Sequence, residues 1–297
     1  MKMVRLDSKG LFYTEWFGAE KGLIGLLLKT NLFSYQPMID GMDRLCILIM
    51  SEVEPGKEIE HFLRDGARIQ VKRVTPAEFE GWLLSSDNHK MVQLLAQGEI
   101  LIDRGGYLSG LRSRLIEWSP LLREQKLLCE FSKFARTYLQ AKQDIKDGQV
   151  LDAYANVMAS LHYWAHIALI EAGMHPELTV WEQLRSVNPG VYKLFEELTT
   201  SQETVEQRVQ LLLLACEFSV LTKMESSCAL LIRVIASRHE PWSPAELMQH
   251  PDLAGLSIDV SLLLQKLTKR GCILEIARPH RARGMGLLEL CYKVSDR

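Results

Sequence analysis

The sequence has no strong excess of charge of either sign. Its 35 lysines and arginines are balanced by 37 aspartates and glutamates, which leaves a formal net charge of −2. A chain with so little net charge has no overall field that attracts nucleic acid or a membrane surface. Any binding to a polyanion must therefore depend on a local cluster of basic residues.

Long apolar runs are also missing. No segment approaches the ~20 apolar residues that a membrane-spanning helix needs, and residues 1–10 lack the apolar run of a signal peptide. The six cysteines form no C-x-x-C pair, and each stands in aliphatic or helical sequence. These absences predict a cytoplasmic protein without membrane contact, in which the thiols are buried and reduced.

The chain does have the length and composition of a globular protein. Of its 297 residues, 47% are hydrophobic and 24% are charged. This is more than one compact core usually accommodates, so two or three domains are expected.

Residues 1–119 alternate between strand and helix patterns. The apolar run 45–50 predicts a central strand covered on both faces, and the run 22–28 predicts a short buried helix packed on a sheet. Asp65-Gly66 predicts the turn of a hairpin, and Thr75-Pro76-Ala77-Glu78 predicts a capped helix start. The remaining predicted elements are a helix over 86–96, a strand over 100–103 and a helix over 107–118.

The rest of the chain is predicted to be mainly helical. Residues 120–224 keep a helical period of apolar residues, which predicts four or five antiparallel helices. Residues 209–221 are apolar nearly all round, as expected of a central helix in such a bundle. Residues 225–297 predict three helices followed by a hairpin, which is the order of a winged helix. The chain is therefore predicted to be an α+β protein with domains at 1–119, 120–224 and 225–297.

The order of elements in residues 1–119 resembles the nucleotidyltransferase superfamily, and the likeness extends to Glu99-Ile-Leu-Ile-Asp103 before a helix. The resemblance implies a mixed sheet with helices, a Gly-Ser turn that cradles phosphate, and three carboxylates that hold magnesium ions. Two of these form a D-x-D motif that enters the central strand, and the third lies on a neighbouring strand.

The sequence keeps only part of that motif. Ser34, in Leu32-Phe33-Ser34, stands where the phosphate-binding turn is expected, but the glycine is absent. Asp43 matches the first aspartate of the pair, and Leu45 occupies the position of the second. Residues 69–72 offer no third carboxylate, and Asp40 is the nearby substitute. One or two carboxylates bind magnesium poorly without substrate phosphates, so the metal site is interpreted as eroded.

The whole chain resembles a bacterial nucleotidyltransferase-like family of the YgxA type, carried by long phrases such as residues 154–181. The resemblance implies a helical bundle that helps to hold an acceptor substrate. Within it, His162 and His166 lie four residues apart on one helical face, close in sequence to His175. No H-E-x-x-H motif or nearby carboxylate completes a metal site, so they are interpreted as residues of a bundle surface or substrate cleft.

The last domain has a local excess of basic residues. From residue 226 to 297, ten lysines and arginines stand against seven acidic residues, and several lie near the end of the presumed recognition helix or at the wing. Contact with DNA or RNA phosphates is expected there, although a helix packed against the bundle and a solvated wing would give the same pattern. The candidate nucleic-acid-binding residues are Lys266, Lys269, Arg270, Arg278, Arg281 and Arg283.

Three functions remain open. The incomplete carboxylate set favours a pseudoenzyme or regulator that binds nucleotide or nucleic acid. The alternatives are an active nucleotidyltransferase, which would need magnesium and a nucleotide, and a DNA-binding regulator that acts through the winged helix. The pattern predicts neither the acceptor substrate nor the oligomeric state.

Overall fold

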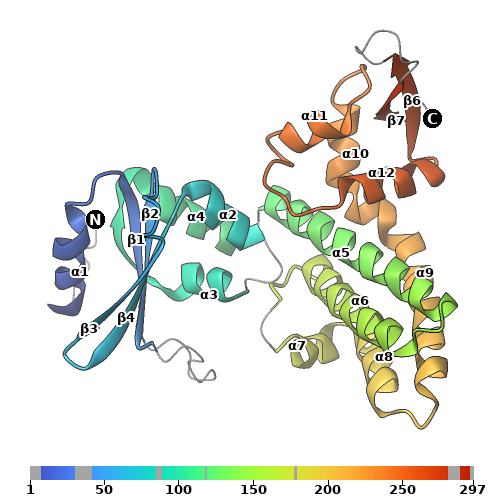
Figure 1. Ribbon diagram of the computed structural model, residues 1–297, viewed down its shortest axis with the longest axis horizontal. Coiled ribbons are helices and arrows are strands. Elements are labelled where there is room, and N and C mark those ends of the chain that lie inside the picture. The colour runs from blue at the N-terminus through green and yellow to red at the C-terminus, as the bar shows by residue number, and fades with distance from the viewer. Residues whose placement is uncertain are drawn as a thin grey trace. The chain divides into compact units, whose positions relative to one another are not determined.

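The computed structural model describes residues 8–30, 42–84, 89–117, 119–176, 179–279 and 288–294. The chain divides into two compact units, Met1–Leu83 with Asp87–Ser119, and Leu84–Ser86 with Pro120–Arg297. Figure 1 labels the elements of both. None of the described helices combines the length and the apolar character that a membrane span requires.

The described part of the first unit is built on a mixed five-stranded sheet with the order β3-β4-β2-β1-β5. β2 pairs in parallel with β4 and antiparallel with β1, while β3–β4 and β1–β5 are antiparallel pairs. Helix α1 covers one face of the sheet, and α2, α3 and α4 lie on the other side (Figure 1). The bounds are α1 Ser8–Gly18, β1 Leu23–Thr30, β2 Arg44–Met50, β3 Ile59–Arg64, β4 Ala67–Val74, α2 Pro76–Leu84, α3 His89–Gln97, β5 Glu99–Asp103 and α4 Tyr107–Ile116.

The local signals of this unit predicted most of these elements. The central strand is confirmed as β2, whose residues from Leu45 onward are all buried. The hairpin is confirmed as β3–β4, and both turn residues, Asp65 and Gly66, have positive φ. The capped start of α2 is confirmed because the Thr75 amide donates to Glu78 Oε2 at 2.8 Å, and the Glu78 amide donates to Thr75 Oγ1 at 3.3 Å.

The helix predicted over residues 22–28 is wrong, because this segment forms strand β1. β1 is hydrogen-bonded to β2 along one edge and to β5 along the other. Its residues Leu26, Leu27 and Leu28 are buried beneath the helices that cover the two faces of the sheet. A short run of leucines has no period that distinguishes a buried helix from a buried strand. The free edge of the central strand decides the outcome, since pairing there gives the backbone groups of the run hydrogen-bond partners.

The second unit begins with a group of helices followed by a helix-turn-helix region with a hairpin. α5 and α6 pack closely along each other and are joined by a turn at Gly148. The bounds are α5 Pro120–Lys146, α6 Val150–Glu171, α7 Val180–Val187, α8 Pro189–Thr200, α9 Val205–Ser227, α10 Ala229–Ala236, α11 Pro244–Gln249, α12 Val260–Lys269, β6 Ile273–Pro279 and β7 Leu288–Val294.

The winged-helix order predicted for the last segment is confirmed. α10, α11 and α12 precede the antiparallel β6–β7 hairpin, and a pair of hydrogen bonds of 2.8 Å between the Trp242 and Tyr292 backbones adds an isolated antiparallel bridge to β7. The capping signature before α11 is also confirmed, because the Ser243 amide donates to Glu246 Oε2 at 2.8 Å.

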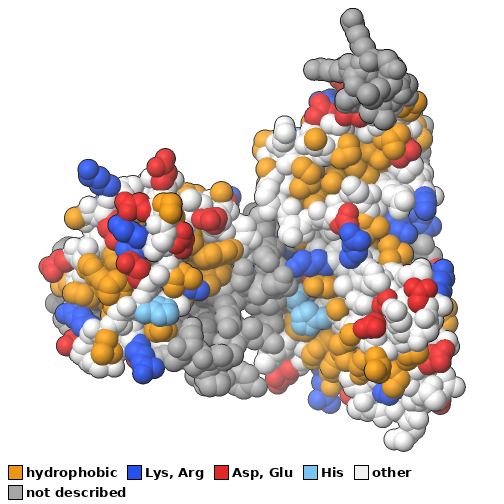
Figure 2. Space-filling model, viewed as in Figure 1, with side chains coloured by type: hydrophobic (Ala, Val, Ile, Leu, Met, Phe, Trp, Pro, Cys, Tyr) orange, Lys and Arg blue, Asp and Glu red, His pale blue; other side chains and the backbone are white. Residues whose placement is uncertain are grey.

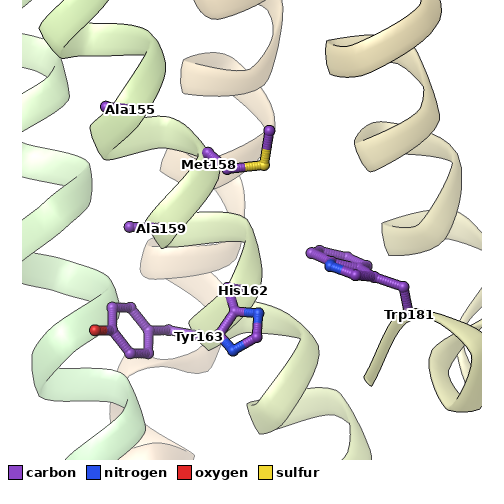
Figure 3. Close-up of a pocket in the computed structure, with 6 residues that line it drawn as sticks. All are labelled: Ala155, Met158, Ala159, His162, Tyr163 and Trp181. Atoms are coloured by element: carbon purple, nitrogen blue, oxygen red, sulfur yellow. The ribbon is translucent and has the colours of Figure 1, made fainter. Parts of the chain in front are cut away.

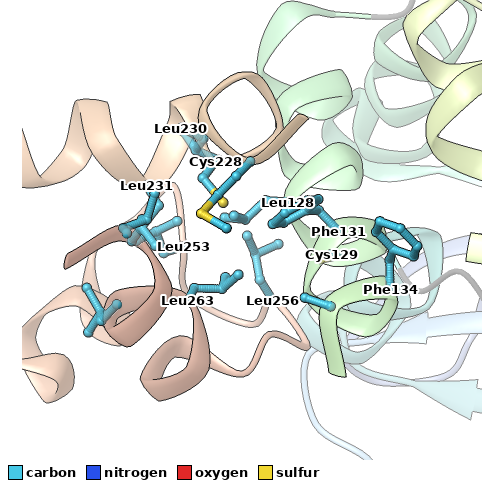
Figure 4. Packing of buried hydrophobic residues seen from close by; sticks show 14 of the residues in the cluster. Leu128, Cys129, Phe131, Phe134, Cys228, Leu230, Leu231, Leu253, Leu256 and Leu263 are labelled. Carbon is cyan, nitrogen blue, oxygen red and sulfur yellow. The ribbon is translucent and has the colours of Figure 1, made fainter. Parts of the chain in front are cut away.

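This region and the helices before it share one hydrophobic core. Leu128 and Phe131 of α5 pack with Leu231 of α10, Leu256 of the loop before α12, and Leu263 of α12 (Figure 4). Polar contacts reinforce the packing, since the Asp259 amide donates to Ser132 Oγ at 2.8 Å and Arg136 pairs with the Asp259 carboxylate. Helix α12 is therefore fixed to α5.

Helix α9 differs from its prediction as a central helix. Its side chains Leu211, Leu214 and Phe218 are 48%, 68% and 69% exposed, so one apolar face has no cover among the described residues. The six cysteines are free thiols, and all except Cys272 are buried, as the sequence predicted.

Candidate functional site

The remnant of the metal motif lies where β2 begins. The carboxylate of Asp43 accepts a hydrogen bond of 2.7 Å from the Arg68 amide, and the Asp43 amide donates to the Arg68 carbonyl at 2.9 Å. These bonds close the end of the parallel β2–β4 ladder. Asp43 thus has a structural role on the exposed rim of the sheet, whereas Ser34 and Asp40 lie outside the described residues.

The neighbouring strand positions do not fit a magnesium site. Leu45 is 8% exposed and belongs to the core, and its partner across the β2–β4 ladder is Gln70. The Gln70 amide nitrogen lies 3.1 Å from the His61 ring, and Lys72 follows two residues later on the same strand. Within the described ranges, no group of three or more histidine, cysteine or acidic side chains is placed to hold a metal ion.

The carboxylates near the sheet edge are paired with an arginine that the sequence did not reveal. Arg73 of β4 donates to both oxygens of Glu20, at 2.7 and 3.1 Å, and also pairs with Glu60 of β3. The Arg73 side chain is only 10% exposed. Its hydrogen bonds to Glu20 raise the pKa of the guanidinium above its ordinary value. Because Glu20 lies just after α1 and Glu60 lies on β3, these ion pairs connect the end of α1 to the β3–β4 hairpin.

The candidate nucleic-acid-binding residues of α12 fall on two faces. Lys269 and Arg270 are exposed at the C-terminal end of the helix, in line with exposed Gln265. Lys266 is half-buried, and its pKa is lowered first by burial and then by the nearby Lys269 and Lys142. Lys266 therefore lies on the side toward α5, and the cations most exposed to solvent are Lys269 and Arg270 at the end of the helix.

The other basic candidates lie at the hairpin. Arg278 is half-buried on β6, and Arg281 and Arg283 lie outside the described residues. Figure 2 shows acidic and basic side chains mixed over the visible face of each unit, with no broad field of one sign among the described residues. This agrees with the near-zero net charge of the chain.

A buried polar cluster lies between α5 and α6. His166 Nδ1 is 3.0 Å from Glu130 Oε2, and both side chains are nearly inaccessible to solvent, at 1% and 5% exposure. Lys126, one helical turn before Glu130, is 7% exposed. Burial lowers the pKa of the Lys126 ammonium to about 8, although the Glu130 charge acts in the opposite direction.

The sequence interpretation holds for His162, which lines a pocket, and is wrong for His166 in two respects. His166 is buried instead of lying at a surface or cleft, and a carboxylate does lie beside it. Glu130 is distant in the sequence and reaches His166 only because α5 packs along α6. The sequence did contain one indication of a buried polar cluster. Lys126 and Glu130 stand one helical turn apart among the apolar residues of α5, where charged side chains are rarely buried without a partner.

A pocket of ≈ 340 Å³ lies against the exposed side of α6, next to α7. Figure 3 shows Trp181 facing α6 across the hollow, with the His162 ring on the side toward it. The Trp181 indole stacks on Phe195 of α8 at a centroid distance of 3.9 Å. The His162 ring lies 4.4 Å from the His166 ring, centroid to centroid. The lining residues are Ala155, Met158, Ala159, His162, Tyr163 and Trp181.

Three family models match the chain in succession. They are described as nucleotidyltransferase-like over residues 12–123, as a YgxA-like substrate binding domain over 124–223, and as a helix-turn-helix domain over 229–294. The uncharacterized protein YgxA of Bacillus subtilis (strain 168) is 34% identical over 236 residues, which is 80% of each chain. The crystal structure of a nucleotidyltransferase-like protein from Exiguobacterium sibiricum 255-15 superposes with a TM-score of 0.82 at 28% identity, covering 96% of this chain and 97% of that one.

Proposed function

The chain belongs to the YgxA family of nucleotidyltransferase-like proteins, and we propose that it uses this fold to bind nucleotide or nucleic acid without transferring a nucleotide. The observation that carries the proposal is the state of the D-x-D positions. Asp43 closes the β2–β4 ladder through the Arg68 amide, and Leu45 packs into the core.

The chemistry of nucleotide transfer explains why these positions matter. Magnesium prefers oxygen ligands in nearly octahedral geometry, and two carboxylates on one strand are the usual means of holding it beside a triphosphate. An aliphatic side chain at the second position supplies no ligand, and the carboxylates Glu20 and Glu60 are already paired with Arg73. The described residues therefore support binding better than catalysis.

Turnover of the four nucleoside triphosphates, with and without magnesium, tests this proposal. We expect pyrophosphate release from the wild-type protein to equal that from Asp43→Asn and Asp43→Ala. Asp43→Asn is the better comparison, because an amide oxygen can still accept the Arg68 N–H and preserve the fold. Magnesium-dependent turnover that both variants abolish would overturn the proposal and establish an active transferase.

A second candidate function is nucleic-acid binding through α12. The segment Val260–Lys269 contains no acidic residue, Lys269 and Arg270 are exposed at its end, and the region matches a helix-turn-helix domain. A recognition helix with this charge pattern suits contact with phosphates at the edge of a groove. The local cations supply the attraction that the net charge of the chain does not.

Binding of fluorescent duplex DNA, measured by anisotropy over a range of salt concentrations, tests this second candidate. Each phosphate contact contributes about −0.9 to the slope of log K against log salt concentration. We expect the double variant Lys269→Glu/Arg270→Glu to lose binding and to reduce the slope by about two. Lys146→Glu, at the exposed end of α5, is the matched control. The second candidate fails if the double variant and the control bind DNA equally well.

The wing residues Arg281 and Arg283, which lie outside the described part of the chain, have a separate test. Replacement of both by glutamate should also weaken DNA binding if the wing contacts phosphate. An unchanged affinity would remove the wing from the proposed interface and leave α12 alone.

A further inference from the structure

We propose that the pocket against α6 binds the base of a nucleotide, a planar heteroaromatic ring that stacks on Trp181. This inference deepens the proposed function and rests on it for the nucleotide class of ligand. Its residues all belong to the second unit, however, so it is independent of the carboxylates of the first sheet.

The size and wall of the pocket suit a flat ring. A volume of ≈ 340 Å³ lies at the lower end of the range for small-molecule sites. Ala155 and Ala159 stand one helical turn apart on α6 and both line the hollow, so small methyl groups form part of its wall. Such a wall leaves room for a ring to lie along the helix, where larger side chains would close the space.

Trp181 supplies a rigid stacking surface. Its indole is stacked on Phe195 with an interplanar angle of 16°, which fixes the ring before any ligand arrives. Fixed aromatic side chains bind bases well because every base has a π-face and little side-chain entropy is lost. Met158, on the facing side of the hollow in Figure 3, adds a polarizable thioether that adapts to a ring edge.

His162 gives the pocket a polar group that can recognise a ring heteroatom. An imidazole offers both a donor and an acceptor nitrogen, as base edges do. Behind it, the His166 ring contacts His162 and is held by the buried carboxylate of Glu130 at 3.0 Å. A buried carboxylate in a helix interface is expensive unless it is hydrogen-bonded. Glu130 and His166 thus act as positioning residues behind a wall of the pocket.

The charges around the lining are compatible with the phosphate of a nucleotide. The Nζ atom of Lys133 lies 5.7 Å from the centre of the Tyr163 ring, which lines the pocket. The six lining residues include no acidic side chain. A lining without acidic side chains does not repel a phosphate attached to a base, as an anionic lining would.

Calorimetric titration of the full chain with AMP, GMP, CMP and UMP tests the proposal, with a short single-stranded oligonucleotide as a second arm. We expect at least one mononucleotide to bind, and Ala159→Leu to weaken its binding tenfold or more because the leucine fills the hollow. Ala159 is half-exposed on a helix, so leucine there should preserve the fold. Ala245→Leu, on an exposed position of α11, is the control and should bind as the wild type does.

Trp181→Leu gives a second readout. Loss of one base–aromatic stack weakens binding about 5- to 150-fold. Glu130→Gln should weaken binding less than Trp181→Leu and alter the preference among the four bases, since it acts through His166 and His162. A merely structural role for Glu130 would lower stability without changing that preference.

The outcomes separate the two proposals. Binding that Ala159→Leu abolishes, together with magnesium-dependent turnover, would support the pocket and refute the pseudoenzyme. Mononucleotide binding that neither Ala159→Leu nor Trp181→Leu changes would overturn the pocket and leave the pseudoenzyme standing. The absence of any mononucleotide or oligonucleotide binding would overturn the pocket and would also contradict the nucleotide-binding role proposed for the chain. Binding of the oligonucleotide alone, lost in Ala159→Leu, would identify a base within a strand as the ligand in place of a free nucleotide.

Discussion

Replacement of the buried Lys126 by methionine should stabilise the second unit, and the gain should depend on pH. Lys126 is 7% exposed, and burial lowers its pKa from 10.5 to about 8. The unfolded chain therefore holds this proton up to about pH 10.5, while the folded chain releases it near pH 8. The unfolded state binds more protons across this range, so the contribution of Lys126 to stability rises with pH between these values.

The magnitude follows from the size of the shift. One pKa unit corresponds to 1.36 kcal/mol, so the charged lysine disfavours the folded state by about 3 kcal/mol at neutral pH and by less than about 1 kcal/mol near pH 10. Methionine has a similar length and no charge to desolvate. Lys126→Met should therefore gain about 2–3 kcal/mol more near pH 7 than near pH 10, or roughly 5–10 °C in Tm for a domain of this size.

Calorimetric unfolding at the two pH values measures this difference, and hydrogen exchange of α5 and α6 assigns the transition to the second unit. The buried thiols Cys129 and Cys216, whose pKa burial raises to about 12, titrate in the opposite sense. Cys216 is present in both proteins and cancels in the comparison. The charge of Lys126 lowers the pKa of Cys129, so its loss raises that pKa further and keeps the thiol protonated in the variant. Lys146→Met, at the exposed end of α5, controls for the loss of one lysine. A gain that is the same at both pH values would refute the reasoning.

Two further substitutions test the contacts of each unit. Arg73→Gln should destabilise the first unit by about 1–3 kcal/mol, because Glu20 and Glu60 lose their shared partner while they remain partly buried. Urea denaturation measures this loss, and an unchanged midpoint would contradict the prediction. Ser243→Ala should lower the stability of the winged-helix region by ~1 kcal/mol, because the side chain that accepts the Glu246 amide hydrogen bond is lost. Ser243→Thr should retain most of this stability, since its hydroxyl can cap the helix in the same way. Equal melting temperatures of the two variants would show that the cap contributes nothing.

The elements that the sequence predicted correctly are those with short-range signals. A capping box such as Thr75 with Glu78, or a turn such as Asp65-Gly66, depends on residues that are neighbours in the chain. The prediction for β1 failed because its leucines show no regular period. Whether this segment forms a helix or a strand depends on the edge that β2 leaves open for pairing. The prediction that α9 is a central helix failed for a related reason, since an apolar sequence does not show which side of the helix is covered by its neighbours.

The candidate sites divide in the same way. Asp43 was identified by its place in a motif, but its bond to the Arg68 amide depends on the register of β2 against β4. Glu130 and His166 belong to different helices, and no spacing rule relates them. His162 was interpreted as a surface or cleft residue and does line the pocket, but the rest of the lining was not predicted, because Trp181 and the α6 alanines come together only through the packing of α7. Local chemistry is readable from sequence, whereas partners across a helix interface are not.

The core that α5 shares with α10 and α12 bears on how such chains evolve. A DNA-binding region joined by a flexible linker can be exchanged between proteins as a module, because its folding is self-contained. Here the side chains that would seal the underside of the winged helix, among them Leu128 and Phe131, are encoded about a hundred residues upstream of it. Recombination at the start of α10 would leave both fragments with an open apolar face. Helix α5 and the region from α10 onward are therefore expected to be inherited together, with substitutions in one compensated by substitutions in the other.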